Sequence, residues 1–238
     1  TFGYRPEAPI VRGMSFRAKA GESVALVGPT GAGKTTVVNL LTRFYETTGG
    51  RILIDGRDIR EYTRDSLRGV FGIVLQDTYL FSGTIKDNIK YGREDATDEE
   101  VREAAAAANA DAFIRQLPKG YDTELSENGG NLSQGQRQLL AIARVVLAKP
   151  SILILDEATS SIDTRTERHI QEALLHIMRG RTTFIIAHRL NTIRDADAIM
   201  VIDGGTIREK GSHDELMRKK GDYYRMFRNQ FKNIVQEA

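Results

Sequence analysis

The sequence predicts an α/β fold with a mostly parallel β-sheet, antiparallel strands near the N-terminus and a helical subdomain inserted in the middle. The first observation is that short apolar runs, such as residues 152–155 and 184–186, are flanked by stretches of helical periodicity. Strands that are apolar on both faces and alternate with helices are typical of parallel sheets. The second observation is that residues 85–150 contain successive helical stretches. This helical block interrupts the alternation and therefore predicts an insertion.

The composition is that of an ordinary globular protein. Of the 238 residues, 40% are hydrophobic and 28% are charged, and a chain of this length buries a substantial core. The net charge of +2 gives no global field that would attract nucleic acid. The lack of cysteine excludes disulfides and thiolate metal sites, and no apolar run approaches a membrane span. The chain begins at "TFGY", inside an apparent strand and without an initiating methionine, so we expect it to be part of a longer polypeptide.

The first part of the chain has the pattern of strands around a glycine-rich turn. Residues 10–18 and 23–28 have the pattern of short strands separated by the turn "KAGE". Residues 35–44 then have helical periodicity. Residues 51–56 predict a strand that ends in a glycine turn, and residues 70–77 predict a further strand.

The helical block begins with residues that favour helix formation. Thr97, followed by Glu100, predicts an N-cap with a capping box. Pro118 and Gly120 predict the end of this helix. A second amphipathic helix starts near Leu132.

After residue 150 the chain returns to alternating strands and helices. We expect a strand at 151–157, a helix at 164–178, a strand at 182–188, a hairpin with a Gly-Gly turn at 198–211, a short helix capped by Ser212 and a last helix at 221–235. These elements complete the α/β pattern.

A phosphate-binding loop is the strongest chemical signal in the chain. The segment "GPTGAGKTT" follows an apolar strand and precedes a helix, with the spacing of one glycine, four residues and Gly-Lys-Thr. Glycines are needed because backbone N–H groups must wrap phosphate oxygens with no Cβ in the way. Lys34 would bring its charge to the β- and γ-phosphates, and the Thr35 hydroxyl would ligate Mg²⁺. The alternative, a glycine-rich surface turn, is disfavoured by the flanking elements. The loop predicts a P-loop NTPase core that binds phosphate through Gly28, Pro29, Thr30, Gly31, Ala32, Gly33, Lys34, Thr35 and Thr36.

A phosphate loop of this kind works together with an acidic residue at the end of a buried strand, and this sequence has two acidic residues in such a place. Asp156 ends the run "ILILD", and its carboxylate would reach Mg²⁺ through the water shell of the metal. Glu157 would act as general base or orient the attacking water. By itself an Asp-Glu pair after a strand is more often a helix cap or a solvated turn, but the phosphate loop favours the catalytic interpretation. His188 ends the next strand, where open α/β sheets bind ligands, and could contact the γ-phosphate or be a hydrogen-bonded structural group.

Four motifs in this order carry a resemblance to a known family. The phosphate loop, the "LSQGQ" helix start, "ILILDEATSSID" and "IIAHR" resemble the nucleotide-binding domain of ATP-binding cassette (ABC) transporters. The resemblance covers almost the whole chain, and "VLQDTYLFSGTIKDNI" is similar to the branch that exports drugs, lipids or peptides. It implies a first part of the nucleotide-binding core at 1–84, a helical subdomain with the signature motif at 85–150, and a second part of the core with C-terminal helices at 151–238.

The resemblance also implies a role for each matching residue. Tyr4 would stack on adenine, and Gln76 would ligate Mg²⁺ and sense the membrane domain. The other nucleotide-binding positions are Ser133, Gly135 and Gln136 of the signature motif and Asp163 of the D-loop. The implied catalytic residues are Lys34, Glu157 and His188, and the implied metal ligands are Thr35, Gln76 and Asp156.

The signature helix implies a dimer. In the family, two such domains associate head to tail, so Ser133 of one would touch the γ-phosphate held by Lys34 of the other. A helix amino end is an anion site, and ATP shared by two half-sites stabilises the dimer until hydrolysis removes its γ-phosphate. The implied function is ATP hydrolysis that powers export by an associated transmembrane domain, on the cytoplasmic face of the cell membrane as part of an integral membrane transporter. Both a homodimer and a heterodimer are compatible with this pattern.

The signature segment departs from the family pattern. Ser133 and Gln136 also fit an ordinary capping box, and both interpretations can hold together. Gln134 stands where the family usually has glycine, and Ser126 and Asn128 stand where glycine and arginine are common. A glutamine near a phosphate either points away or crowds the site. Crowding would weaken this half-site and would favour a partner of different sequence.

Two other functions share parts of the pattern. A soluble ABC ATPase that acts on nucleic acid or ribosomes usually carries coiled-coil insertions or two cassettes, and neither is found in this sequence. A regulatory nucleotide-binding module without turnover is disfavoured by the intact Lys34, Asp156, Glu157 and His188. We therefore expect a second nucleotide-binding domain and a transmembrane domain as partners, and no nucleic acid.

Overall fold

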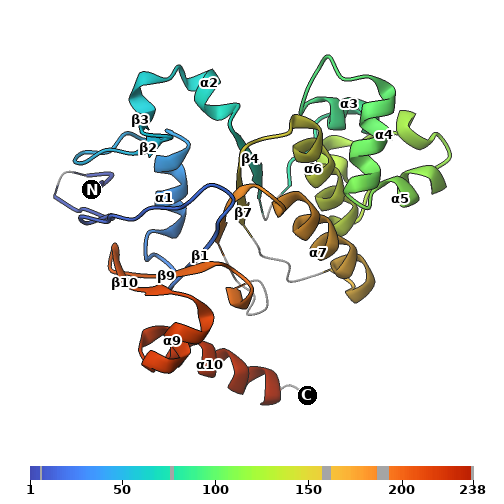
Figure 1. Ribbon diagram of the computed structural model, residues 1–238. Helices are drawn as coiled ribbons and strands as arrows, with labels where there is room; N and C mark the ends of the chain where they lie inside the picture. The colour runs from blue at the N-terminus through green and yellow to red at the C-terminus, as the bar shows by residue number, and fades with distance from the viewer. Residues whose placement is uncertain (6, 76–77, 157–161, 187–192, 237–238) are drawn as a thin grey trace. The chain divides into compact units, whose positions relative to one another are not determined.

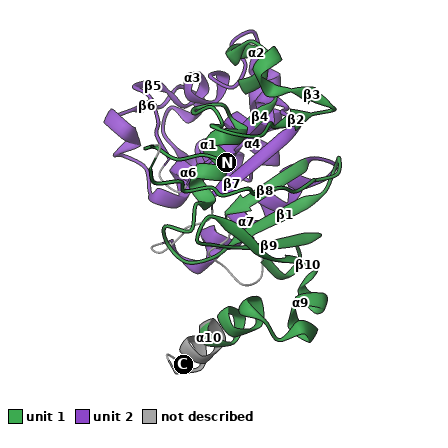
Figure 2. Cartoon of the chain, turned by 90° about the vertical axis from the view of Figure 1, so that its left-hand side faces the viewer, with its two compact units in different colours: residues 1–71, 182–238 green, residues 72–181 purple. Residues whose placement is uncertain are grey.

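The chain divides into two compact units, and each is described by itself. Unit 1 comprises residues 1–71 and 182–238, and unit 2 comprises residues 72–181 (Figure 2). The structure, a computed structural model, describes all residues except 6, 76–77, 157–161, 187–192 and 237–238 (Figure 1).

Unit 1 is built on parallel strands. β1 (Ser23–Val27) lies between β8 (Thr182–Ile186) and β9 (Ala198–Asp203) and is parallel to both. β10 (Thr206–Gly211) runs antiparallel to β9 at the edge. The parallel strands are almost entirely buried, because continuous apolar runs must be covered on both faces. The mostly parallel sheet predicted from the sequence is therefore confirmed.

The β9–β10 hairpin turns at two glycines, as the sequence predicts. Gly204 and Gly205 have φ values of 55° and 76°, which a two-residue hairpin turn of type I′ requires. A Cβ on Gly205 would also lie 1.9 Å from the carbonyl oxygen of Ile10. Backbone conformation and close contact together demand glycine at this position.

A helix and a small hairpin follow β1. Helix α1 begins at the end of the phosphate loop, and the chain then turns at Asp55 and Gly56, whose φ values are 50° and 82°. The strand predicted at 51–56 is thus the first arm of a hairpin. The elements of this region are α1 (Lys34–Leu41), β2 (Leu53–Ile54), β3 (Arg57–Asp58), the 3-10 helix η1 (Ile59–Glu61) and α2 (Arg64–Arg68).

The N-terminal antiparallel pairing consists of isolated bridges. Phe2 pairs with Val11, and Arg5 pairs with Ala8. The continuous strand predicted over residues 10–18 is wrong. Gly13 has a φ of 56°, and this left-handed conformation interrupts extended backbone.

The end of the chain in unit 1 is helical. Helices α9 (His213–Lys219) and α10 (Asp222–Gln236) follow β10, and Ser212 caps α9 as predicted. The Glu209 carboxylate on β10 accepts hydrogen bonds from the first two N–H groups of α10, at 3.1 and 2.9 Å. Among the helices that the structure describes, none is long and apolar enough to cross a membrane.

Unit 2 contains two short strand pairs. β4 (Phe71–Val74) lies beside β7 (Ile152–Asp156), and β5 (Gly83–Thr84) is antiparallel to β6 (Glu124–Leu125). A Cβ on Gly72 would lie 2.7 Å from the Val145 side chain. Glycine therefore lets β4 approach the helix that carries Val145.

Helices make up most of unit 2. They are α3 (Ile85–Lys90), α4 (Asp98–Ala107), α5 (Asp111–Gln116), the 3-10 helices η2 (Gly120–Asp122) and η3 (Glu127–Gly129), α6 (Gln134–Ala148) and α7 (Thr164–Met178). Helix α6 packs against α3, α4 and α7, and its apolar face is buried. The capping box of Thr97 and Glu100 is confirmed at the start of α4.

The helix predicted after Thr97 is divided in two. Asn109 has a φ of 56° between α4 and α5, and asparagine tolerates this left-handed conformation better than most residues. Its side-chain amide donates a 3.0 Å hydrogen bond to the carbonyl oxygen of His169 on α7. This contact, distant in the sequence, stabilises the break.

Candidate functional site

The phosphate loop in unit 1 is shaped by its glycines. It leaves the end of β1 and turns into α1 (Figure 1). Gly28, Gly31 and Gly33 have φ values of 150°, 80° and 104°, and a Cβ on Gly28 would lie 2.0 Å from the carbonyl oxygen of Ile202. Side chains at these positions would distort the loop, so glycine is required for its backbone to curve in this way.

Lys34 lies over this loop. Its Nζ donates hydrogen bonds to the carbonyl oxygens of Gly28, at 2.7 Å, and Pro29, at 3.0 Å. Gly33 precedes the helix, and none of the described side chains caps α1. A helix amino end with an ammonium group held beside it is suited to bind an anion.

The remaining loop residues differ in exposure. Thr35 is exposed in the first turn of α1, whereas Thr36 and Ala32 are buried. Pro29, Thr30 and Gly31 are exposed at the tip of the loop. The Thr35 hydroxyl is therefore accessible to a ligand, while the Thr36 side chain packs into unit 1.

Tyr4 lies beside the phosphate loop. Its hydroxyl is 3.5 Å from Oγ1 of Thr36, and the residue is 51% exposed. The exposed ring surface can stack on a flat apolar group, and the contact with Thr36 places that group next to the phosphate loop.

The signature segment starts helix α6 in unit 2 with a capping box. The Ser133 hydroxyl accepts a hydrogen bond from the N–H of Gln136 at 3.2 Å, and Oε1 of Gln136 accepts one from the N–H of Ser133 at 3.0 Å. The predicted capping box is confirmed. Ser133 is exposed, and Gln134 and Gln136 are partly exposed.

Gly135 has a packing reason to be glycine. It is buried, and a Cβ there would lie 2.3 Å from Cγ2 of Thr166 and 3.2 Å from Cγ2 of Ile162. Helix α6 therefore approaches the start of α7 closely at this residue. The close contact explains the glycine without any ligand.

Two acidic site residues are described in unit 2. Asp156 is the last residue of β7 and is partly exposed. Asp163 caps α7, and the N–H of Thr166 donates to its carboxylate at 3.0 Å. These hydrogen bonds from Thr166 hold the pKa of Asp163 below its usual range. Gln76, Glu157 and His188 lie outside the described residues.

The departures before the signature segment form a local turn. Asn128 has a φ of 55°, a conformation that asparagine tolerates. The Ser126 hydroxyl donates to Oδ1 of Asn131 at 3.3 Å, and Nδ2 of Asn131 donates to the carbonyl oxygen of Glu124 at 3.1 Å. Both residues thus fit the backbone that leads into α6.

Sequence reasoning missed an exposed aromatic patch in unit 2. The patch is defined as Tyr79, Phe81 and Tyr91, which are all exposed. The ring centroids of Tyr79 and Phe81 are 5.3 Å apart, and those of Phe81 and Tyr91 are 4.5 Å apart. The Arg144 guanidinium lies 5.4 Å from the centroids of both Phe81 and Tyr91. It also donates to the carbonyl oxygens of Asn88 and Tyr79, and burial lowers its pKa. The alternation of aromatic residues in "TYLFSG" was the available signal.

A second missed group surrounds Tyr4. The rings of Phe2 and Tyr45 both contact it, with centroids 5.1 and 5.0 Å away. Tyr45 comes shortly after the phosphate-loop helix in the sequence, far along the chain from Tyr4. No local pattern could have revealed this contact.

Comparisons with known proteins identify the family of this chain. Residues 11–160 match the ABC transporter family. The chain is 60% identical over 231 residues to the ABC transporter ATP-binding protein YfiC of Bacillus subtilis, covering 97% of this chain and 38% of that protein. It is 58% identical over 227 residues to a fatty acid ABC transporter ATP-binding/permease protein of Mycobacterium bovis, covering 95% of this chain and 36% of that protein.

A solved structure shows the same fold. A bacterial Atm1-family ABC exporter with ATP bound superposes with a TM-score of 0.90 at 50% identity, covering 96% of this chain and 40% of that chain. The chain thus spans less than half the length of these relatives. The family match over most of the chain, the high identities and the shared fold lead to one conclusion: this chain belongs to the ABC transporter family.

Proposed function

We propose that this chain binds Mg-ATP on its phosphate loop and hydrolyses it in a head-to-tail dimer that powers export through a transmembrane domain. The observation that carries the proposal is the loop itself. Three glycines with positive φ curve it, Lys34 lies over it and Tyr4 lies beside it. These two neighbouring places within unit 1 would receive the triphosphate and the adenine. ATP is also the ligand named for the solved Atm1-family exporter.

Each residue of the loop has a definable task in binding. Backbone N–H groups at the start of α1 would bind phosphate oxygens, and Lys34 would exchange its two carbonyl contacts for the β- and γ-phosphates. The exposed face of the Tyr4 ring would stack on adenine. Binding therefore combines charge at one end of the nucleotide with apolar contact at the other.

Mg²⁺ would be held by oxygen ligands. From the family resemblance we assign this role to the exposed Thr35 hydroxyl and to the Asp156 carboxylate, which are donors of the type that this ion prefers. When bound, the ion would neutralise charge on the phosphates. We assign Gln76 to the same role from the family resemblance.

Hydrolysis requires a base and a group that contacts the γ-phosphate. We assign Glu157, which follows Asp156 directly, to orient or deprotonate the attacking water. We assign His188 to the γ-phosphate. From the family resemblance we assign a polar contact of the site to Asp163, whose charged form is favoured by hydrogen bonds from Thr166.

The signature helix would complete the site of a second domain. Ser133 is exposed at the amino end of α6, and the capping box fixes the backbone there. Its hydroxyl and nearby N–H groups would bind the γ-phosphate held by Lys34 of the partner domain. Because both domains bind the same nucleotide, ATP would stabilise the dimer and hydrolysis would release it.

The aromatic patch is the surface we assign to the transmembrane partner. Its three rings are exposed, and those of Phe81 and Tyr91 lie against the Arg144 side chain. Exposed apolar clusters of this kind mark interaction sites. The Mycobacterium bovis relative is named as a joint ATP-binding/permease protein. We therefore place this chain at the cytoplasmic face of a membrane. The name of this relative and the solved exporter favour export over action on nucleic acid or ribosomes.

The experiment is ATP turnover as a function of protein concentration. If the active form is a dimer, the rate of ATP hydrolysis per molecule should rise with protein concentration and then saturate. Glu157→Gln should abolish turnover, whereas Glu172→Gln, on the exposed surface of α7, should leave it unchanged. A specific rate independent of concentration would contradict the dimer, and full turnover by Glu157→Gln would remove that residue from catalysis.

A further inference from the structure

Three aromatic rings form one cluster next to the phosphate loop in unit 1. The Tyr4 ring is nearly perpendicular to those of Phe2 and Tyr45, at 85° to each, and the Phe2 and Tyr45 centroids are 5.5 Å apart. Phe2 is buried, whereas Tyr45 is 44% exposed. Edge-to-face contacts of this kind are attractive beyond the area they bury. Two neighbours therefore restrain the plane of the Tyr4 ring while half of its surface stays exposed.

The backbone ties the segments of Tyr4 and Tyr45 together. The carbonyl oxygen of Thr1 accepts hydrogen bonds from the N–H groups of Thr48 and Gly49, at 3.0 and 3.3 Å. The segment that carries Tyr4 is thus attached to the chain just beyond Tyr45.

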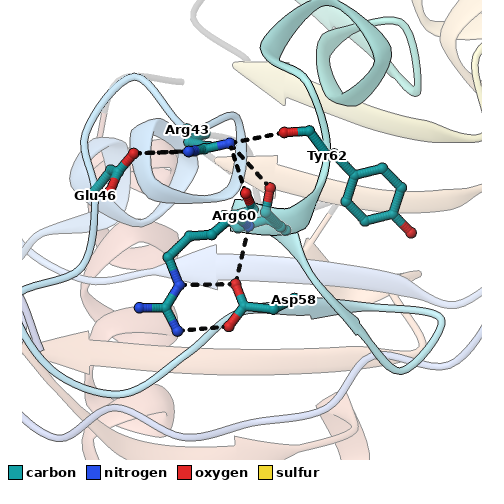
Figure 3. Close-up of polar contacts among 6 residues, drawn as sticks. Arg43, Glu46, Asp58, Arg60 and Tyr62 are labelled. Carbon is teal, nitrogen blue, oxygen red and sulfur yellow. Dashed lines mark hydrogen bonds and ion pairs between the residues drawn. The ribbon is translucent and has the colours of Figure 1, made fainter.

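Arg43 fixes the segment that carries Tyr45. It has a φ of 54° at the end of α1, and only 15% of its side chain is exposed. Its guanidinium donates to the carbonyl oxygens of Ile59, Arg60 and Tyr62, at 3.3, 3.5 and 3.0 Å, and pairs with Glu46 at 2.9 Å (Figure 3). The ion pair of Arg43 with Glu46 therefore holds the residues on both sides of Tyr45. The hydrogen bonds to Thr1 hold the chain a few residues further on.

We infer that Tyr45 is a positioning residue of the nucleotide site, which holds the Tyr4 ring in the orientation that receives adenine. The inference rests on the proposed function, because it assumes that Tyr4 stacks on the base. A ring already held in its bound orientation loses less conformational freedom when the nucleotide binds. Tyr45 would thus raise the affinity for the base without touching the phosphates.

The test compares two ligands of the 238-residue chain. ATP presents both base and phosphates, whereas inorganic tripolyphosphate presents only the phosphates. Calorimetric titration of each ligand should show that Tyr45→Ala weakens ATP binding about two- to tenfold, the equivalent of one aromatic pair. Affinity for tripolyphosphate should stay unchanged. A merely structural role, in which the loss of Tyr45 disturbs the phosphate loop, would weaken both ligands and would overturn the inference.

Further variants guard against misfolding and define the chemistry. Tyr45→Phe keeps the ring and should retain ATP affinity, whereas Tyr45→Leu keeps apolar volume without a flat ring and should behave like Tyr45→Ala. Tyr224→Ala, a partly exposed tyrosine on α10, is the matched control and should bind both ligands normally. Equal ATP affinity of the Tyr45→Leu and Tyr45→Phe variants would contradict a positioning role for the ring.

A Tyr4→Ala background separates failure of the inference from failure of the proposed function. If Tyr4 stacks on adenine, Tyr4→Ala weakens ATP binding alone, and adding Tyr45→Ala has no further effect. If Tyr4→Ala weakens ATP binding but Tyr45→Ala does not, only the inference fails. If Tyr4→Ala changes neither ligand, the adenine site proposed at Tyr4 fails and the inference fails with it.

Discussion

Gly135 provides the sharpest test of how the signature helix is built. In Gly135→Ala, the new Cβ would lie 2.3 Å from Cγ2 of Thr166, more than 1 Å inside ordinary van der Waals contact. Overpacking of this kind costs about 1–3 kcal/mol. For a chain of this size, about 2 kcal/mol lowers the Tm by about 4–8 °C. Thermal and urea unfolding followed by circular dichroism measure the change directly.

A second substitution tests the named contact. Thr166→Ser removes the Cγ2 methyl and keeps the hydroxyl, so the double variant Gly135→Ala/Thr166→Ser should regain most of the lost stability. Gly69→Ala is the matched control, because Gly69 has helical φ and a Cβ there would lie 3.4 Å from its nearest atom. Its unfolding should change by less than about 1 kcal/mol. Equal stability of Gly135→Ala and the control, or no recovery in the double variant, would refute the packing argument.

Three further predictions concern the nucleotide, the signature motif and pH. Tyr4→Ala should raise the KM for ATP by about tenfold with kcat little changed, because base stacking is worth about 1–3 kcal/mol; an unchanged KM in steady-state assays would remove Tyr4 from the site. Gln134→Gly should raise the ATPase rate if the glutamine crowds the phosphate of the partner, and an unchanged rate would mean that it points away. Burial raises the pKa of Tyr223 from 10.0 to about 12, so between these values the unfolded chain loses a proton that the folded chain keeps, and stability should fall as pH rises. Urea midpoints from about pH 9 to about pH 12 should fall less for Tyr223→Phe, and parallel curves would contradict the buried hydroxyl.

Local patterns in the sequence predict much of this fold. The capping boxes at Thr97 and Ser133 and the Gly-Gly hairpin follow from chemistry within a few residues. The break at Asn109 and the contact between Gly135 and Thr166 depend on another helix. Such contacts have no periodic signature, so the sequence does not reveal them.

The candidate site likewise combines a local sequence motif with contacts that depend on tertiary packing. The phosphate loop is a contiguous motif that can be found in the sequence alone, and three of its glycines have positive φ. The cluster of Phe2, Tyr4 and Tyr45 joins segments that are far apart in the chain. It is formed by tertiary packing, and only the structure reveals it.

The central claim is that Ser133 of one chain faces the γ-phosphate held by Lys34 of another. The most direct measurement is sedimentation of Glu157→Gln with Mg-ATP, in the presence of a second substitution at Ser133. Ser133→Asp and Ser133→Asn both preserve the helix cap, but only aspartate would place negative charge against the phosphate. We predict an ATP-dependent dimer for Glu157→Gln that the Asn variant retains and the Asp variant loses. Dimerisation of equal strength in the Asp and Asn variants, or a dimer formed without ATP, would contradict the claim.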